Sequence, residues 1–565
     1  MQFRAPLLVV VALAVPSLAI RAAEAEIVAV IASDPYADLK KQIRWVGTLI
    51  DQPMLDVLAE TPIMGLTQFK GLAGLDVARP LGLVVTAAGD LPVVHAYVPV
   101  KDLGKLLDAL VGVLGPVEVA DGVRRVSPPG GIPLEIVERD GWAIIGPPGS
   151  TAPLDDPTAA FDAIAKPFTI GVEAFPHRMP EGMREQLRTL LERAAAAAAA
   201  QGRQVDPAGL TGILENLQQT QSLLLGVAID VADERVYVES RNQMLPGTPA
   251  AAAFAAAAET VGTVASPTTA DGKPPAVSLH VAAAVPENLR RGAIDGLATI
   301  EAQDGSDVGT QTAVSILKAA LAAMIEAGGY DAALAIDTSA VDGEPRSRVP
   351  AITAGMRVKD GAALEARIKK LVGDAGAVPG LAVAFDTGAV AGANLHTITL
   401  ESADLPGGEP GAEPVRITLA VAPNYAFVLA GGDVAARLAA VADGSGKPAP
   451  SAVPVADVTV AVGPVLRYAA ALAPRDHDGG VEAAGLEAAA AVADAQASAL
   501  VQLLLRPIER GLSLRLSADA GAIRTVAASV KSPAGGPRRG APALAPDSRA
   551  PDSRAPGPLA PALAP

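Results

Sequence analysis

The sequence predicts an α+β protein of two similar lobes, with antiparallel or mixed sheets and helices packed on one face. Two observations predict this fold class. A segment that opens with Val-Lys-Asp occurs twice, and a unit of strand, proline and helix occurs four times. Strands joined by short hairpins, with helices between them, favour this architecture over a parallel α/β fold.

Length and composition restrict the function classes. A chain of 565 residues has the length of two to four domains. Half of the residues are hydrophobic, which is enough for sizeable cores and argues against global disorder. The net charge is −16, from 45 Lys and Arg against 61 Asp and Glu, which disfavours binding to nucleic acid. The chain has no cysteine, so disulfides, thiolate metal sites and thiol catalysis are excluded.

The repeated Val-Lys-Asp segment predicts two helices of similar build. The first begins after Asp102 and ends at Gly115, and the second begins after Asp360 and ends at Gly373. Apolar residues four positions apart give each helix one buried side, and glycine suits a left-handed C-terminal cap. The two segments are offset by 258 residues throughout.

Each helix is followed by strands that end in a similar hairpin. The turn Asp140-Gly141 precedes a strand beginning at Trp142, and the turn Pro423-Asn424 precedes one beginning at Tyr425. The offset is now 283, so the second copy carries 283 − 258 = 25 additional residues, which we place around residues 405–414.

The second recurring unit is a strand, then a proline, then a helix. Proline is tolerated in the first turn of a helix, because the N–H that it lacks has no partner there. The strands of the four units are residues 27–31, 170–174, 277–282 and 458–462, and the prolines that follow them are Pro35, Pro180, Pro286 and Pro464.

These repeats predict a domain organisation. Residues 1–25 have the features of a signal peptide: Arg4, an apolar stretch to Val15, and small residues that allow cleavage after Ala19 or Ala25. An uncleaved anchor is the alternative. We expect a first lobe at 26–258, a linker at 259–275, a second lobe at 276–531 and a disordered Pro/Ala-rich tail at 532–565. The protein should be exported to the periplasm or the cell surface, with no membrane span after cleavage.

The search for chemistry assigns no catalytic, cofactor-binding or metal-binding residue. His95, His280 and His396 lie in alternating strand patterns and His177 in a turn, where structural roles are the usual ones. The one local cluster is Asp476-His477-Asp478, which could hold a cation or orient a base. A loop turn rich in Asp and Gly is the interpretation that we favour, and we expect no enzyme and no cofactor.

The signal peptide, the repeated Val-Lys-Asp helices and the Pro-rich tail make the chain similar to uncharacterised alanine-rich exported proteins of bacteria. This resemblance implies no activity and no catalytic residue. We expect a non-catalytic envelope scaffold or interaction module, whose partner is an envelope protein or an apolar small molecule. The alternatives are a periplasmic carrier of an apolar ligand and, third, a hydrolase that uses Asp476, His477 or a pair of carboxylates.

Overall fold

The computed structural model describes most of the chain between residues 26 and 531. The described ranges are 26–120, 123–129, 131–150, 152–200, 217–259, 262–264, 275–284, 329–338, 350–375, 381–400, 414–446, 455–472 and 479–531, with isolated positions between 291 and 326. The expected signal peptide, most of the expected linker and the expected tail therefore lie outside the described residues.

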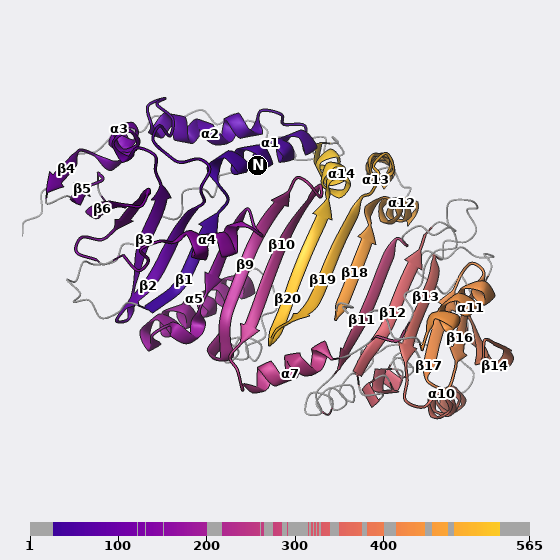
Figure 1. Ribbon diagram of the computed structural model, residues 1–565. Coiled ribbons are helices and arrows are strands. Elements are labelled where there is room, and N and C mark those ends of the chain that lie inside the picture. Colours follow the sequence, from indigo (N-terminus) through magenta and orange to yellow (C-terminus); the bar gives the residue numbers. More distant parts are fainter. Residues whose placement is uncertain are drawn as a thin grey trace, which may run out of the picture.

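The twenty strands in the described ranges join one sheet, and every pairing among them is antiparallel (Figure 1). The strands of the N-terminal half are β1 Glu26–Ser33, β2 Leu81–Ala88, β3 Leu91–Pro99, β4 Val117–Ala120, β5 Val123–Val126, β6 Leu134–Arg139, β7 Trp142–Gly146, β8 Ile170–Ala174, β9 Thr220–Asp230 and β10 Arg235–Met244. Those of the C-terminal half are β11 Val277–Ala284, β12 Gly329–Asp337, β13 Ala351–Arg357, β14 Leu381–Val390, β15 Ala393–Leu400, β16 Val415–Val421, β17 Tyr425–Ala430, β18 Ala456–Ala461, β19 Leu500–Ile508 and β20 Gly511–Asp519.

The strands of each half stay together in the sheet. From one end, the order is β4-β5-β6-β7-β3-β2-β1-β8-β9-β10, followed by β20-β19-β18-β11-β12-β13-β17-β16-β15-β14. The halves meet where β10 pairs with β20, with Arg235 opposite Asp519 and Gln243 opposite Gly511. The α+β class is thus confirmed, and the two predicted lobes share a single sheet.

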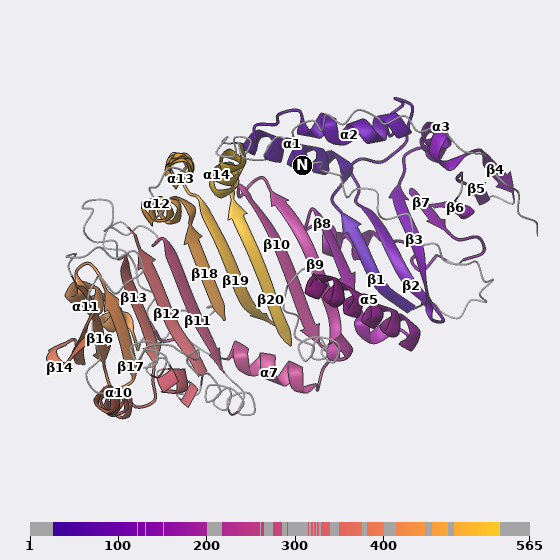
Figure 2. The ribbon, with the colours of Figure 1, turned by 180° about the vertical axis from the view of Figure 1, so that it is seen from behind.

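Helices lie mainly along the two ends of the strands (Figures 1 and 2). The helices are α1 Tyr36–Leu49, α2 Leu55–Leu66, α3 Leu103–Leu114, α4 Thr158–Ala165, the short 3-10 helix η2 Pro176–Arg178, α5 Glu181–Ala200, α7 Pro249–Ala258, α10 Gly361–Ala375, α11 Val434–Gly444, α12 Val462–Leu472, α13 Gly479–Asp494 and α14 Ala520–Lys531. In Figure 1, α1, α2, α12, α13 and α14 lie at the upper ends of the strands, and α5, α7 and α10 lie at the lower ends.

The Val-Lys-Asp segments have the same local role in both halves. The carboxylate of Asp102 accepts the backbone N–H of Lys105 at 3.0 Å, and that of Asp360 accepts the N–H of Ala363 at 3.0 Å. Each aspartate therefore caps the N-terminus of its helix, α3 or α10. Gly115 ends α3 with a φ of 77°, as predicted, whereas α10 continues past Gly373 to Ala375.

The four strand–proline units also form strands, as β1, β8, β11 and β18. Pro35 and Pro180 directly precede α1 and α5, as predicted. Pro464 differs, because α12 begins two residues earlier, at Val462. Pro286 and residues 405–413 of the expected insertion lie outside the described residues.

The helices do not pack on one face of the sheet only. Trp142 and Ile144 of β7 belong to a cluster with Phe161 of α4, whereas Ala143 of the same strand belongs to a cluster with Leu103 of α3. Successive side chains of a strand point to opposite faces, and β7 is apolar at both sets of positions. Such a strand must be covered on both sides, so the prediction of one covered face is wrong here.

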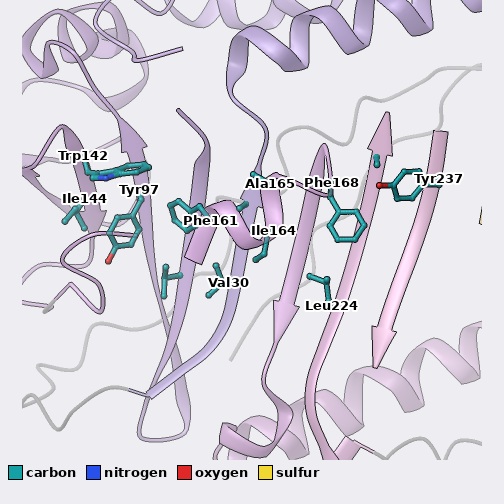
Figure 3. Packing of buried hydrophobic residues seen from close by; sticks show 13 residues of the cluster. Val30, Tyr97, Trp142, Ile144, Phe161, Ile164, Ala165, Phe168, Leu224 and Tyr237 are labelled. Carbon is teal, nitrogen blue, oxygen red and sulfur yellow. The ribbon is translucent and has the colours of Figure 1, made fainter. Parts of the chain in front are cut away.

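Aromatic rings form the centre of the N-terminal core (Figure 3). Tyr97, Trp142 and Phe161 meet edge to face, with ring centroids 5.7–6.4 Å apart. All three side chains are fully buried. The few aromatic residues of the chain thus anchor α4 to the sheet, where edge-to-face contacts add to the gain from burial.

Candidate functional site

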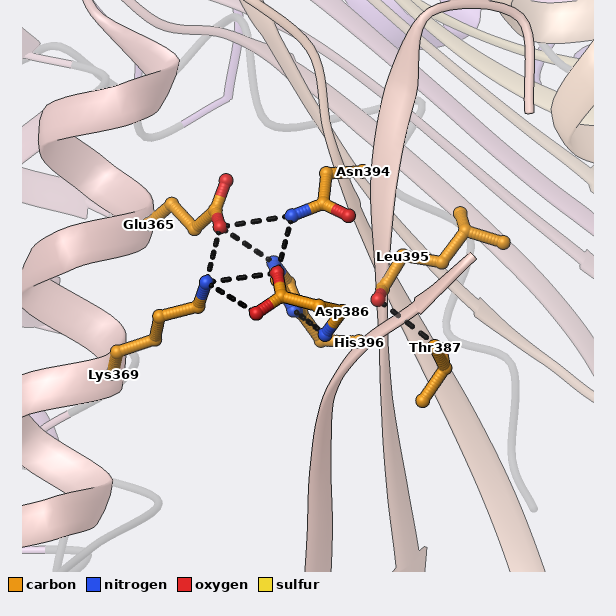
Figure 4. Close-up of polar contacts among 7 residues, drawn as sticks. All are labelled: Glu365, Lys369, Asp386, Thr387, Asn394, Leu395 and His396. Carbon is orange, nitrogen blue, oxygen red and sulfur yellow. Dashed lines mark hydrogen bonds and ion pairs between the residues drawn. The ribbon is translucent and has the colours of Figure 1, made fainter. Parts of the chain in front are cut away.

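A cluster of polar side chains lies in the C-terminal half between α10, β14 and β15 (Figure 4). Glu365 and Lys369 are four residues apart on α10 and so share one side of the helix. Asp386 projects from an irregularity in β14, where the register shifts between Ala384 and Gly388 and the φ of Asp386 is 55°. Asn394 and His396 lie on the paired strand β15, two residues apart and on one face.

One ammonium group is shared by the two carboxylates of the cluster. The ammonium of Lys369 lies 2.6 Å from Glu365 Oε1 and 2.8 Å from Asp386 Oδ1. Asn394 Nδ2 donates to the same two oxygens at 2.9 and 2.7 Å. Hydrogen bonds from Lys369 and Asn394 lower the pKa of Asp386, and those to Asp386 and Glu365 raise the pKa of Lys369. The ammonium therefore holds the two carboxylates together.

The same residues have the composition of a cation site. Ligand atoms of Glu365, Asp386 and His396 lie within 4.8 Å of one another. His396 is 1% exposed, and its Nε2 has no hydrogen-bond partner and faces Glu365 Oε1 at 3.6 Å. Burial lowers the pKa of His396, although Glu365 opposes this, so the ring is neutral near pH 7.

The geometry nevertheless fits an ammonium better than a metal ion. The backbone N–H of Asp386 donates to His396 Nδ1 at 3.1 Å, so the neutral ring carries its proton on Nε2. A protonated Nε2 offers no lone pair to a metal, and the Lys369 ammonium already lies against both carboxylates. This arrangement ties α10 to the β14–β15 hairpin and has no free base or nucleophile among these groups.

The histidines considered from the sequence fall into several environments. His95 and His280 lie in β3 and β11, and His396 in β15, so their placement in strands is confirmed. His95 is buried, with Nε2 3.0 Å from Ser150 Oγ. His177 lies in η2. The segment Asp476-His477-Asp478 lies outside the described residues.

A second polar site lies where the two halves meet. It is a cleft of about 520 Å³ on one face of β8, β9, β10, β20 and β19, with Ala163 of α4 at its wall. At its floor, Glu239 of β10 is 2% exposed. Its carboxylate accepts hydrogen bonds from Arg241 at 2.6 Å, Arg515 at 2.7 Å and Ser513 at 2.8 Å. Two of these donors, Ser513 and Arg515, belong to β20.

The buried carboxylate of Glu239 is stabilised in its ionised form. Burial alone would raise the pKa of Glu239, but the hydrogen bonds from Arg241, Ser513 and Arg515 more than offset it and hold this pKa below its usual value. A carboxylate with so many donors is a poor general base and a poor metal ligand. Its structural effect is to join β10 to β20.

The opposite face of the same strands is apolar and open to solvent. One row of directly paired residues crosses eight strands without a polar side chain, and we call this row and the aliphatic residues beside it the apolar face. The row is Ile170, Val227, Val238, Leu516, Leu503, Val458, Leu279 and Leu334, on β8, β9, β10, β20, β19, β18, β11 and β12.

None of these eight side chains is buried. The exposed fractions of Ile170, Val238, Leu503 and Leu516 lie between 37% and 49%. The neighbouring row adds Leu225 and Leu514, which are 51% and 43% exposed and which flank Ser240 of β10. In both ribbon views, no helix lies over β10, β20, β19 or β18 (Figures 1 and 2). Soluble monomers rarely expose a contiguous apolar surface of this extent.

Sequence reasoning found none of these three sites. Glu365, Asp386 and His396 are far apart along the chain, and no local spacing marks them as a group. The strand pattern could have indicated the apolar face, because the apolar residues of the segment 512–516 alternate with Ser513 and Arg515. It could not tell which face of the sheet would stay uncovered.

Comparisons with known proteins identify no relative: no family model, no curated protein and no solved structure matches the chain. None of the helices in the described ranges combines the length and the hydropathy needed to cross a bilayer.

Proposed function

We propose that the protein is a non-catalytic exported scaffold or interaction module of the envelope, which binds its partner through the apolar face. The observation that carries this proposal is the uninterrupted aliphatic row from Ile170 to Leu334, which crosses both halves of the sheet. Exposing such side chains to water costs a free energy of about 25 cal/mol for each Å² of apolar surface. A partner that covers the face would remove this cost. The polar clusters support a non-catalytic role, because the carboxylates of Glu239 and Glu365 are held by cationic donors.

We also propose that the two halves arose by duplication of one ten-stranded lobe. Adding ten to each strand number of the N-terminal half gives the strand order of the C-terminal half, read outward from the junction: β10, β9, β8 and β1 correspond to β20, β19, β18 and β11. The capping aspartates Asp102 and Asp360 fall on equivalent helices. On this proposal, the β10–β20 pair lies on an approximate twofold axis, and the apolar face is built from equivalent strands of both lobes.

A periplasmic carrier of an apolar ligand is the second candidate. Ligand pockets usually enclose most of the ligand surface. The apolar face lies open on the sheet, and the cleft on the other face is lined by charged residues such as Glu173, Arg241 and Arg506. The scaffold therefore fits the arrangement of surfaces better than the carrier does.

Cysteine labelling tests the proposed function, because the natural chain has no thiol. Leu516→Cys places a single thiol on the apolar face. Leu58→Cys is the matched control, since Leu58 is 58% exposed on α2, outside that face. In envelope fractions of the host, we expect a water-soluble maleimide to react at least about tenfold more slowly with the Leu516→Cys thiol than with the Leu58→Cys thiol. Equal rates, in fractions where the fold is intact, would contradict the proposal.

A further inference from the structure

We propose that the partner of the apolar face is a second copy of this chain, so that two sheets pack face to face. This inference rests on the proposed function, because it names the occupant of the same surface. Sheets stack about 10 Å apart when aliphatic side chains of their facing sides interdigitate. The row from Ile170 to Leu334 supplies such side chains on every strand that it crosses.

The distribution of charge is compatible with this occupant. Two copies with a net charge of −16 each repel one another, and this repulsion is weakest when the surfaces in contact carry no charge. The charged residues of the central strands, including Glu239, Arg241 and Arg515, point to the opposite face, into the cleft. The row itself contains only Val, Leu and Ile. A second copy can therefore approach this face without bringing like charges into contact.

The extent of the face suits a dimer. Eight strands spaced about 4.8 Å apart span about 34 Å. The row from Ile170 to Leu334, with one row on each side of it, such as those of Leu514 and Ala518 beside Leu516, spans about 20 Å along the strands. The resulting footprint is roughly 700 Å², close to the roughly 800 Å² that each partner contributes to a standard interface. A symmetric dimer also requires one patch that fits its own copy. A flat aliphatic surface, with Val238 of β10 directly opposite Leu516 of β20 at its centre, meets this requirement.

A lipid surface fits the face less well. Segments that bind membranes usually combine apolar residues with Lys and Arg, which attract anionic lipids, and with Trp or Tyr at the interface. The row from Ile170 to Leu334 has none of these residue types. Membrane binding is accordingly a result that would overturn this inference.

Sedimentation equilibrium of the purified full chain tests the inference. We expect a species of twice 56.7 kDa at micromolar concentration. The double variant Leu514→Glu/Leu516→Glu should raise the dissociation constant at least about 100-fold, because each dimer would then bury four carboxylates at its centre. Leu58→Glu, on the exposed side of α2, should leave the dimer unchanged. Leu516→Gln, which adds no charge, should weaken the dimer in the same direction if the double variant does not fold.

Three results would overturn the inference. The first is a wild-type chain that is still monomeric at about 100 μM. The second is a folded Leu516→Gln chain that dimerises like the wild type, and the third is flotation of the chain with phosphatidylglycerol vesicles that depends on Leu516. The labelling experiment separates the two proposals. A monomeric chain whose Leu516→Cys thiol is still protected in the envelope contradicts the second copy and leaves the interaction module standing. A monomeric chain with an unprotected thiol contradicts both.

Discussion

Arg515 on β20 donates to the carboxylate of Glu239 on β10 at 2.7 Å, across the one strand pair that joins the two halves of the sheet. Arg241 and Ser513 complete the donor set. The guanidinium groups also lie over aromatic rings: that of Arg515 is 4.3 Å from the ring centre of Tyr237, and that of Arg241 is 5.4 Å from that of Phe168. The junction is thus held by main-chain pairing and by one buried ionic network.

Replacement of Glu239 by glutamine tests the importance of this network. Glu239→Gln keeps the shape of the side chain but leaves Arg241 and Arg515 without a charged acceptor. Loss of one partner from a buried ion pair is strongly destabilising, and both arginines are partly exposed, so we expect the free energy of unfolding to fall by about 2–3 kcal/mol. Urea denaturation at pH 7 measures this loss.

The pH dependence of the same variant provides its control. The pKa of Glu239 is lower in the folded chain than its ordinary value of 4.5, so the network stabilises the protein above pH 4.5 and its contribution falls as the pH drops below that value. The difference in stability between the wild type and Glu239→Gln should therefore shrink on acidification. A difference that stays constant from pH 7 to pH 3 would show that ionisation of Glu239 is unimportant.

The sequence could predict the local features of this fold but not the junction. The alternation of apolar residues predicts β8, and the turn residues predict the Asp140-Gly141 hairpin. The Val-Lys-Asp segments predict two capped helices. These features are predictable because capping and alternation depend on residues that are neighbours in the sequence. The β10–β20 pair joins Glu239 to Arg515, which are 515 − 239 = 276 residues apart. No property of either strand alone specifies that partner.

The polar cluster of the C-terminal half was unpredictable for a related reason. His396 is placed correctly in a strand by its neighbours Leu395 and Thr397. Its contact with Asp386, however, depends on the irregularity in β14 and on the positive φ of Asp386, which alternation does not encode. The cluster therefore emerges only when α10 and the hairpin have been packed together.

His396 should make stability depend on pH in a second range. Burial lowers the pKa of His396 below its ordinary value of 6.5, so the unfolded chain binds a proton more readily than the folded chain below pH 6.5. Its contribution is present above pH 6.5 and is lost as the pH falls toward the lower folded pKa. Each unit of depression corresponds to about 1.4 kcal/mol.

A comparison of the wild type with His396→Asn isolates this effect. The stability of both proteins is measured by thermal unfolding between pH 8 and pH 5. Glu365, Lys369 and Asp386 face the ring and are retained in both proteins. We expect the stability of the wild type to fall more steeply below pH 6.5 than that of the variant. Parallel pH profiles would show that His396 titrates alike in the folded and unfolded chains.

Asp331 of β12 should be important for the segment that precedes β11. Its buried carboxylate accepts hydrogen bonds from the backbone N–H of Thr263 at 2.8 Å, from Thr263 Oγ1 at 2.6 Å and from the N–H of Val264 at 3.2 Å. Asp331→Ala leaves these donors without an acceptor, and we expect a loss of about 2–3 kcal/mol in urea denaturation. Asp331→Asn, which retains one acceptor oxygen, should lose less. Equal losses in the two variants would contradict this account.

The last prediction concerns Gly226 of β9, which lies beneath the ring of Phe168. A Cβ at Gly226 would meet three atoms of that ring at 2.3–2.6 Å, closer than any real contact, and the ring is fully buried and cannot move aside. Gly226→Ala should therefore destabilise the protein by about 2–3 kcal/mol through overpacking. Gly65→Ala, in α2 and with no atom near its added Cβ, should instead stabilise it by about 0.5–1 kcal/mol.

A double-mutant cycle with Phe168→Leu separates steric overlap from backbone strain. If the ring is the obstacle, Gly226→Ala should cost at least about 1 kcal/mol less in the Phe168→Leu background, because contacting residues show coupling of this size. If the cost were the same in both backgrounds, the glycine would be needed for its backbone conformation rather than for space. The structure favours the steric cause, because the φ of Gly226 is not in the left-handed region and its place in the β8–β9 and β9–β10 ladders is regular.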